Sequence, residues 1–505
     1  MAQYPNLPGI EVQIADGGLI LPEDTTTESL LIIAPSLRAT APKEPVLVRQ
    51  SSDLETNGFG AFVEGGKVNP IAAAWKAAFE GGNRRTYLMS YGKMKSDGSV
   101  EDVDAMAMTT NEKFTFLQES FFGALADFTV QHVAIVGVYA DEEATFTAAP
   151  TLSEGVVNDY FVEGTKTLVI TAGTNDTLVV EGKTLTLTAK TYASDSELIK
   201  ELEEEIAEKG LNLKVSIVAG KVRLSRETAF TIGTGSKAFG IAAGAATGKI
   251  TGNFALLAGQ FAENQTLNHT ATIAYVGVKA PTGNTLGQVK ANVDRLLGLK
   301  NEYSGYVSVV ASPELGYLLP GRSELYFTNG VVTYAALAST LRPESATTNK
   351  RVYGVAGIHY NLSLRQLNSL TAAKYVTFRL KGNQVVVTDG CTTAPDYYLG
   401  GSKQSSDFAR LSTLRITQAA AQLIRDLTEP FIGEPNRMPQ YNSMNATIKG
   451  GLEAMKSQGA IMDYRFTVVS RGGTLSEAVV TLEIVPAFEL KRVSINVSLK
   501  PPYTM

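Results

Sequence analysis

The glycine-rich stretch at residues 233–252 comes closest to a phosphate-binding loop. A Walker A loop needs a glycine, four further residues, and then Gly-Lys followed by Ser or Thr, so that backbone amides surround the phosphates. Here Gly248-Lys249 is followed by Ile250, and Ala243 stands where the first glycine belongs. The Gly-Thr-Gly at 233–235 also fails to become a dinucleotide fingerprint, because Ala238 replaces the third glycine. The sequence therefore does not favour a nucleotide site.

The side chains that most often bind metals or act as nucleophiles are few and separated: His132, His269, His359 and Cys391. No two of the histidines have metal-ligand spacing, and a lone histidine beside strand residues is more often structural. Cys391 follows an Asp-Gly turn, and we interpret it as a buried thiol, although proximity to His359 in the fold stays open. The acidic runs at 141–143 and 203–205 are interpreted as a solvated loop and a helix face. We expect no catalytic residue, no metal and no cofactor.

Composition limits the class of protein further. At 505 residues, with 44% hydrophobic and 19% charged residues, the chain is expected to form about two to four globular domains. A net charge of −5 and scattered lysines and arginines argue against direct nucleic-acid binding. A single cysteine excludes an internal disulfide and fits assembly in a reducing cytosol. We see no secretory signal and no apolar run long enough to cross a bilayer, so we expect a soluble protein without membrane insertion.

The elements that would position these residues alternate between helix and strand over residues 29–150 and 253–404. A clear helix begins at Asn69-Pro70, where Asn69 is expected to cap it and Pro70 suits its first turn. Other predicted helices cover 112–127 and 286–299, and predicted strands cover 30–34, 45–48, 85–90, 131–138 and 306–311. Such alternation predicts an α/β body on a mixed sheet.

Residues 151–252 differ in composition from the α/β body, because they are rich in Thr, Val and Gly. Strands are predicted at 167–171, 178–180, 184–188, 214–218 and 222–225. One helix interrupts them, with a capping box made by Ser194 and Glu197 and an end at Gly210. We interpret this segment as an inserted β-rich domain that projects outward, because insertions survive best at exposed loop tips.

Residues 405–487 predict a smaller α+β unit. Helices are expected at 413–427 and 443–458, and strands at 463–470 and 477–485, joined by a turn at 471–473. In the second helix, Met444, Ile448, Leu452 and Met455 form one apolar stripe. The fold class is therefore α/β and α+β, multidomain, with extended strand arms at both ends.

Each of the two arms, residues 1–28 and 488–505, contains a stretch, 10–15 and 493–499, in which apolar and polar residues alternate with the period of a half-buried strand. The apolar positions are Ile10, Val12, Ile14, Val493, Ile495, Val497 and Leu499. A double proline at 501–502 stops the last strand, and no hairpin partner follows it. The arms either pair inside their own domain or add to the sheets of neighbouring copies, which would build a lattice through main-chain hydrogen bonds.

Taken together, the chain resembles the contractile tail sheath proteins of bacteriophages and related injection machines. The stretches that carry the likeness are Leu-Pro-Gly-Ile-Glu-Val at 7–12; the run of strand, Phe-Gly, helix, Gly-Gly and strand at 45–90; the central segment 343–366; and 411–500, with its Arg-bearing helix, Glu-Pro-Asn at 434–436, Gly-Ala-Ile at 459–461 and closing strands. Each piece is weak alone, whereas their order is specific. Residues 151–252 would be a variable insertion.

The resemblance implies a structural subunit without enzymatic activity. Its copies would form six-fold rings around a tail tube, linked by donated strands, and contraction would drive the tube through a cell envelope. The implied partners are further copies, the tube protein, and the baseplate and tail terminator proteins, in a virion assembled in the host cytoplasm. We propose Lys449, Glu453 and Lys456 on helix 443–458 as tube-facing, with an ordinary solvated face as the alternative. A filament, shell or surface-array protein and a cytosolic α/β enzyme are the competing interpretations.

Overall fold

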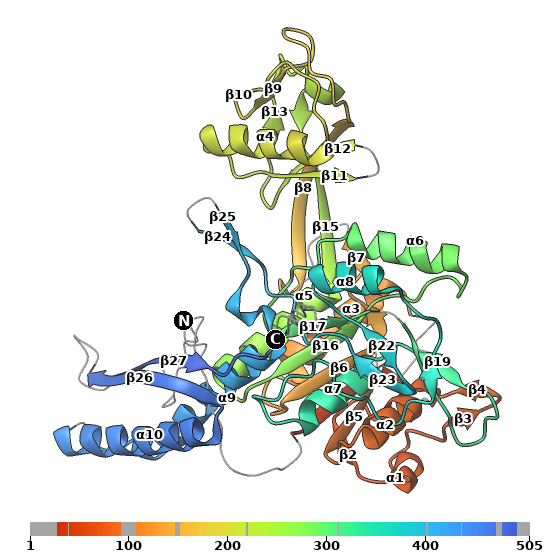
Figure 1. Cartoon of the computed structure of the whole chain (residues 1–505), viewed down its shortest axis with the longest axis vertical. Helices are drawn as coiled ribbons and strands as arrows, with labels where there is room; N and C mark the ends of the chain where they lie inside the picture. The colour runs from red at the N-terminus through yellow and green to blue at the C-terminus, as the bar shows by residue number, and fades with distance from the viewer. Residues whose placement is uncertain are drawn as a thin grey trace, which may run out of the picture. The chain divides into compact units, whose positions relative to one another are not determined.

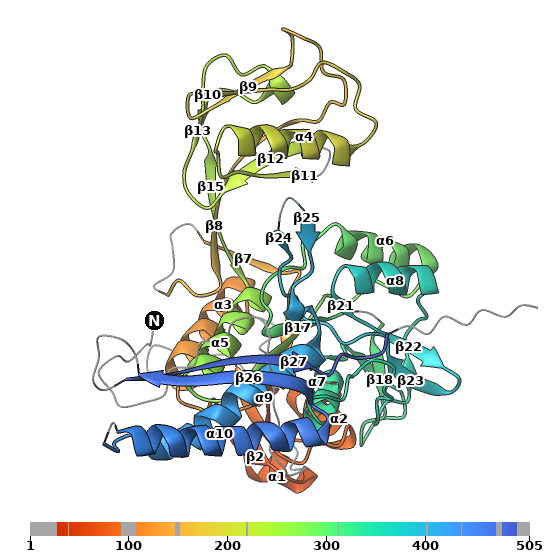
Figure 2. The ribbon, with the colours of Figure 1, turned by 60° about the vertical axis from the view of Figure 1, so that its left-hand side comes forward.

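The computed structural model describes residues 28–38, 40–91, 108–146, 152–218, 221–311, 313–399, 402–435, 437–470 and 477–491. The chain forms two compact units. Unit 1 comprises the residues up to Thr109, Glu119–Glu142 and those from Phe254 onward. Unit 2 comprises Thr110–Gln118 and Glu143–Asn253. Figures 1 and 2 show their elements.

Unit 1 is built on a seven-stranded sheet with the order β2-β5-β1-β6-β16-β17-β21. The strands are β1 (Leu30–Pro35), β2 (Val46–Val48), β5 (Thr86–Tyr91), β6 (His132–Tyr139), β16 (Ile273–Gly277), β17 (Val307–Val310) and β21 (Tyr375–Val376). All neighbours pair in parallel except β2 with β5. The central strands read as unbroken apolar runs, as parallel strands covered on both faces do. The predicted mixed sheet is confirmed.

Helices α2 (Pro70–Glu80) and α7 (Val331–Thr340) pack on each other, α2 also on β1 and α7 on β6. Helix α5 (Phe254–Asn268) packs on β16 and β17. The other helices of this region are α1 (Ser51–Thr56), α6 (Leu286–Leu297) and α8 (Leu364–Ala372). Short strands complete it: β3 (Val63–Glu64), β4 (Lys67–Val68), β18 (Leu315–Tyr317), β19 (Tyr326–Thr328), β20 (Gly357–Ile358), β22 (Phe378–Lys381), β23 (Gln384–Val387), β24 (Tyr397–Leu399) and β25 (Ser402–Gln404).

The predicted side-chain cap at Asn69 is wrong, although Asn69 does occupy the N-cap position of α2. Its amide nitrogen donates to the carbonyl oxygen of Phe59 at 2.7 Å, and its amide oxygen accepts from the backbone N–H of Leu37 at 3.4 Å. The side chain is fully buried, so its amide must find partners inside the fold, and these two loop groups supply them. The tertiary contacts therefore take the oxygen that the helix end would have used.

Unit 2 contains a five-stranded sheet, β11-β12-β8-β15-β7, and a four-stranded sheet, β10-β9-β13-β14. The strands are β7 (Glu143–Phe146), β8 (Val156–Thr165), β9 (Thr177–Val180), β10 (Lys183–Thr186), β11 (Lys214–Val218), β12 (Lys221–Arg226), β13 (Thr231–Ile232), β14 (Gly244–Ala245) and β15 (Thr247–Asn253). Helix α4 (Asp195–Glu208) packs on β10 and β11. Helix α3 (Thr110–Glu119) continues at Ser120–Ala124 as a π-helical turn. The predicted domain limits, 151 and 252, and the outward projection stay predictions.

Two local predictions in unit 2 need correction. The strand predicted at 167–171 is wrong, since only Val169 pairs there, with Thr191. The amide of Asn175 takes the backbone groups of this segment, accepting from the N–H of Thr171 at 2.7 Å and donating to the carbonyl of Val169 at 2.9 Å. The Ser194 cap at the start of α4 is confirmed, but the capping box predicted with Glu197 is wrong. The carboxylate of Glu197 accepts from the N–H of Ala193, one residue before the cap, and not from that of Ser194.

The C-terminal part of unit 1 contains helices α9 (Leu411–Thr428) and α10 (Met438–Gln458) and the hairpin of β26 (Ile461–Ser470) and β27 (Ala478–Pro486). Both helices begin earlier than predicted, by two and five residues. Gly459 ends α10 at a φ of 80°, a conformation that favours glycine. The predicted turn at 471–473 lies outside the described residues. No helix within the described ranges combines the length and apolar character that a bilayer crossing requires.

Candidate assembly site

The glycine-rich stretch has a packing role in unit 2. A Cβ atom at Gly248 would lie 2.8 Å from the ring of Tyr160, and one at Gly252 would lie 2.6 Å from the ring of Phe114. Contacts this short are not tolerated, so both positions require glycine for close approach of aromatic rings. These glycines are explained without any bound phosphate.

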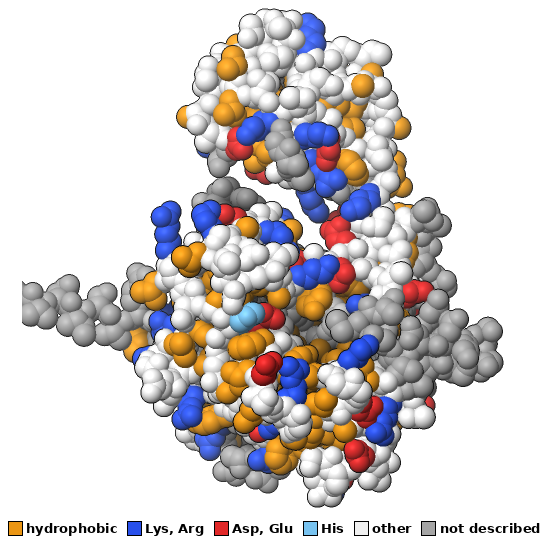
Figure 3. Space-filling model, turned by 90° about the vertical axis from the view of Figure 1, so that its right-hand side faces the viewer, with side chains coloured by type: hydrophobic (Ala, Val, Ile, Leu, Met, Phe, Trp, Pro, Cys, Tyr) orange, Lys and Arg blue, Asp and Glu red, His pale blue; other side chains and the backbone are white. Residues whose placement is uncertain are grey.

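The candidate metal and nucleophile residues do not converge. His132 contacts Tyr275 and Glu28, while His359 Nδ1 contacts Glu314 Oε2 at 2.9 Å. Among the residues the structure describes, no three His, Cys, Asp or Glu side chains are placed to bind a metal ion. Cys391 is buried, and burial raises the pKa of its thiol, which disfavours the reactive thiolate. On the part of unit 1 visible in Figure 3, basic side chains lie among acidic and apolar ones.

The helix–hairpin module, formed by α10 and the β26–β27 hairpin, shares one apolar core with α9, which contributes Ile416, Ala420 and Leu423. Ile448, Leu452 and Met455 of α10 are fully buried against the inner face of the hairpin. That inner face consists of Tyr464, Phe466, Val468, Val480, Leu482 and Ile484. The hairpin is a two-stranded sheet, so within the described chain each strand has one edge without a strand partner. Packing on α10 stabilises the two strands, while their open edges are templates for added strands.

The three predicted tube-facing residues differ in their surroundings. The hydroxyl of Tyr464 donates to Glu453 Oε1 at 2.7 Å, and Lys456 Nζ lies 2.8 Å from Asp463 Oδ1. These two side chains therefore bridge α10 to β26, and the hydrogen bond to Asp463 raises the pKa of Lys456. Lys449 is exposed and forms no ion pair with the described part of the chain. It is the one of the three most available to a partner.

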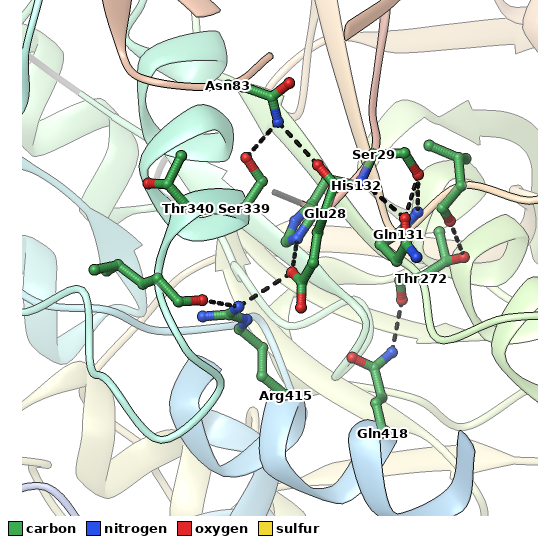
Figure 4. A network of polar contacts seen from close by, with 12 residues as sticks. Glu28, Ser29, Asn83, Gln131, His132, Thr272, Ser339, Thr340, Arg415 and Gln418 are labelled. Carbon is green, nitrogen blue, oxygen red and sulfur yellow. Dashed lines mark hydrogen bonds and ion pairs between the residues drawn. The ribbon is translucent and has the colours of Figure 1, made fainter. Parts of the chain in front are cut away.

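A buried polar network holds Glu28, the first described residue (Figure 4). Its carboxylate Oε2 lies 3.1 Å from the guanidinium of Arg415 in α9 and 2.5 Å from Nε2 of His132 in β6. Its backbone N–H donates to the carbonyl of Ser339 at 3.1 Å, and Asn83 donates to its carbonyl at 2.9 Å. We call Glu28, His132 and Arg415 the N-terminal anchor.

The protonation states of the N-terminal anchor follow from burial and charge. Burial lowers the pKa of His132, so the imidazole is neutral; its Nε2–H donates to Glu28 and its Nδ1 accepts from the hydroxyl of Tyr275 at 2.8 Å. Burial opposes ionisation of Glu28, but Arg415 and His132 outweigh it and lower the pKa of this carboxyl. The anchor is thus one carboxylate between a guanidinium and a neutral imidazole donor.

A second cluster lies where the described chain ends. Arg410 NH1, just before α9, lies 2.5 Å from Asp389 Oδ1 and 2.7 Å from Glu489 Oε1. Lys491 Nζ lies 2.7 Å from Asp389 Oδ2, and the hydroxyl of Thr348 donates to both carboxylates. We call these five residues the C-terminal anchor. Burial and the neighbouring Asp389 raise the pKa of Glu489 despite Arg410.

Sequence reasoning missed both anchors, because their members are far apart: Glu28 and Arg415 are 387 positions from each other. One signal was present. Leu411, Leu414, Arg415 and Gln418 fall at i, i+3, i+4 and i+7, so polar side chains occupy a buried helix stripe and require buried partners.

The apolar residues of the two arms lie outside the described residues: Ile10, Val12, Ile14, Val493, Ile495, Val497 and Leu499. Their pairing stays a prediction. The structure shows a two-stranded hairpin with open edges and the anchored residues beside each arm.

No protein-family model matches this sequence, and no curated protein matches it. Among solved structures, the chain is similar to one in the contracted helical sheath of the anti-feeding prophage, with 12% identity, 99% of this chain and 100% of that chain covered, and a TM-score of 0.50. A chain in the six-fold symmetrised baseplate of the same particle shows 11% identity, coverage of 98% and 99%, and a TM-score of 0.51. At such identity the likeness shows the fold, which is shared over the whole length.

Proposed function

We propose that this chain, which has the fold of contractile sheath proteins, is a structural subunit of a contractile tail sheath. Its copies would polymerise as six-fold helical rings around a tail tube, and contraction of the array would drive the tube through a cell envelope. The observation that carries the proposal is the match in fold, over nearly the full length of both chains, to a subunit of a contracted helical sheath. The open-edged hairpin supports it independently.

Strand donation would link the copies. An arm of a neighbouring copy that pairs with a free edge of β26 or β27 would extend this two-stranded sheet into a larger one. Each main-chain hydrogen bond would contribute roughly 0.5–1.5 kcal/mol net. Burial of each apolar arm side chain would add roughly 1.5–3 kcal/mol. These links would survive while the bodies of the subunits rotate, so the arms would act as hinges.

Contraction requires an extended array in which the contacts between subunit bodies are weaker than the contacts formed after contraction. Two discrete packings of rigid bodies, connected by strands that do not part, meet this requirement. The tube protein would contact the exposed side of α10, where Lys449 is available. Baseplate and tail terminator proteins would bound the array at its ends, in a virion or a related particle assembled in the host cytoplasm. The chain would have no catalytic role.

The arms can be tested by electron microscopy and sedimentation of the purified full chain. We expect hollow helical tubes from the wild type. A chain that ends at Lys491 keeps its anchor residues but lacks the last strand, and it should remain monomeric. A full-length variant with Val493, Ile495, Val497 and Leu499 changed to serine should behave like the truncation.

The matched control alters the alternate positions instead, as Ser494→Thr, Asn496→Gln and Ser498→Thr, and should polymerise. Efficient tube formation by the truncated chain would contradict strand donation. Discrete small oligomers from the wild type would contradict the sheath itself.

A further inference from the structure

We propose that helix α9 is the common anchor of both chain ends, and that Arg415 and Arg410 set the points at which the two arms leave the body. The inference rests on the proposed function, because it assigns positioning residues to the arms. Arg415 holds Glu28 at one end, and Arg410 holds Glu489 at the other. The two arginines are five positions apart.

Helix α9 is itself fixed to the body by polar contacts. Arg415 donates to the carbonyls of Leu341 at 2.7 Å and Arg342 at 3.3 Å. Further along, Gln418 donates to the carbonyl of Thr272 at 2.7 Å. Arg425 donates to carbonyls at the end of α5, including that of Thr266 at 2.9 Å, where a helix leaves its last carbonyls unpaired. A chain end held by α9 is therefore held by the core sheet and its helices.

The C-terminal anchor also fixes which side chains face outward. After β27 the exposure of residues 487–490 alternates along the chain, as it does where successive side chains point to opposite sides. Glu489 and Lys491 reach Asp389 and Arg410, whereas Phe488 and Leu490 are 70% and 83% exposed. A slip by one residue would bury apolar side chains among charges. The ion pairs thus set both the direction and the register of the segment that precedes the arm.

The order of the elements along the chain connects the two anchors to the hairpin. In the chain, α9 is followed by the 3-10 turn Glu429–Phe431 and then by α10 and the hairpin, and α9 and α10 pack on each other. The arms that a subunit would donate begin beside α9, and the hairpin that would accept arms follows it in the chain. Donated and accepted strands would therefore be linked through the packing of α9 on α10, and loosening either arginine should weaken the lattice.

The test uses the full chain with Arg415→Gln, Arg410→Gln and Lys491→Gln, compared with Lys290→Gln, which breaks an exposed pair on α6. Hydrogen exchange is followed at residues 28–30 and 487–491, where the N–H of Ala487 donates to the carbonyl of Ala460. We expect Arg415→Gln to speed exchange at 28–30 by roughly tenfold or more, the factor for a lost charge-assisted hydrogen bond. Arg410→Gln and Lys491→Gln should do the same at 487–491, and all three should lower tube yield.

Lys491→Gln keeps the test decisive if the buried arginine variants fail to fold, because Lys491 is 46% exposed. Unchanged exchange at both segments would overturn the anchors. Faster exchange with wild-type tube yield would overturn their role in positioning the arms, while leaving the sheath proposal intact. Absence of tubes from the wild type would overturn the proposed function, and exchange would still decide whether α9 holds the ends.

Discussion

Replacing His132 by glutamine should remove a pH dependence of unit 1 that its buried imidazole creates. His132 is 1% exposed and neutral, between Glu28 and the hydroxyl of Tyr275. Burial lowers its pKa below the ordinary value of 6.5, Arg415 lowers it further, and Glu28 opposes both. The unfolded chain would protonate this imidazole near pH 6.5, whereas the folded chain resists protonation.

The sign and size follow from proton linkage. Because the folded-state pKa is below the unfolded one, the contribution of His132 to stability is complete above pH 6.5 and is lost as the pH falls through that value. Where the folded state takes up no proton, the loss between pH 7.5 and 5.5 reaches about 1.4 kcal/mol, a tenfold change in the unfolding equilibrium. Glu28 adds its own loss only below its ordinary pKa of 4.5, because its pKa is lowered. The window from 7.5 to 5.5 therefore excludes the loss from Glu28, and the difference between the wild type and His132→Gln assigns the imidazole's share.

The single tryptophan makes the measurement specific to unit 1. Trp75 lies buried in α2, with its indole N–H donating to the carbonyl of Val48 at 3.1 Å. Urea unfolding followed by its fluorescence at each pH gives the free energy of unfolding of this unit. The control is His359→Gln, which removes a partly exposed imidazole from the same unit. A His132→Gln chain that loses as much stability as the wild type over this range would refute the reasoning.

Other predictions address the helix–hairpin module and its surroundings. Leu452→Ala empties a fully buried position and should cost the module about 2–5 kcal/mol, seen as faster exchange of the β26 and β27 amides; unchanged exchange there would contradict its placement in the core. Cys391 should react with a thiol reagent only slowly until urea is added, because burial raises its pKa; immediate reaction in the native chain would contradict that burial. Lys449→Glu should impair assembly on tubes, whereas Lys200→Glu on exposed α4 should not; equal assembly by both would remove the tube-facing role.

Much of the α/β body could be predicted because its patterns are local and strong. The apolar run at the start of β1 and the stripe of α2 each indicate an element and its buried face without reference to the rest of the chain. Errors arose where an asparagine side chain bonds to loop backbone groups that the local pattern does not indicate. Asn69 bonds to the loop at Phe59 rather than to its helix, and the amide of Asn175 takes backbone groups that a predicted strand would have used.

The anchors show a different limit of sequence reasoning. A buried ion pair leaves no periodic trace when its members are hundreds of residues apart, as Glu28 and Arg415 are. What the sequence could have shown is one half of the Glu28 pair, namely Arg415 in the apolar stripe of α9, which requires a buried acceptor. The identity of that acceptor depends on the whole fold.

The pKa values of the two anchoring carboxyl groups shift in opposite directions, so different substitutions are needed to test each anchor. At the N-terminal anchor the surroundings favour the charged form of Glu28, so neutralising it removes stabilisation. At the C-terminal anchor two carboxylates share Arg410, and the pKa of Glu489 is raised, so its charge opposes folding at neutral pH. Neutralising Glu489 would relieve repulsion from Asp389 as well as remove an ion pair. Substitutions at Arg410 and Lys491, whose loss leaves the carboxylates uncompensated, are therefore the ones that release the C-terminal segment.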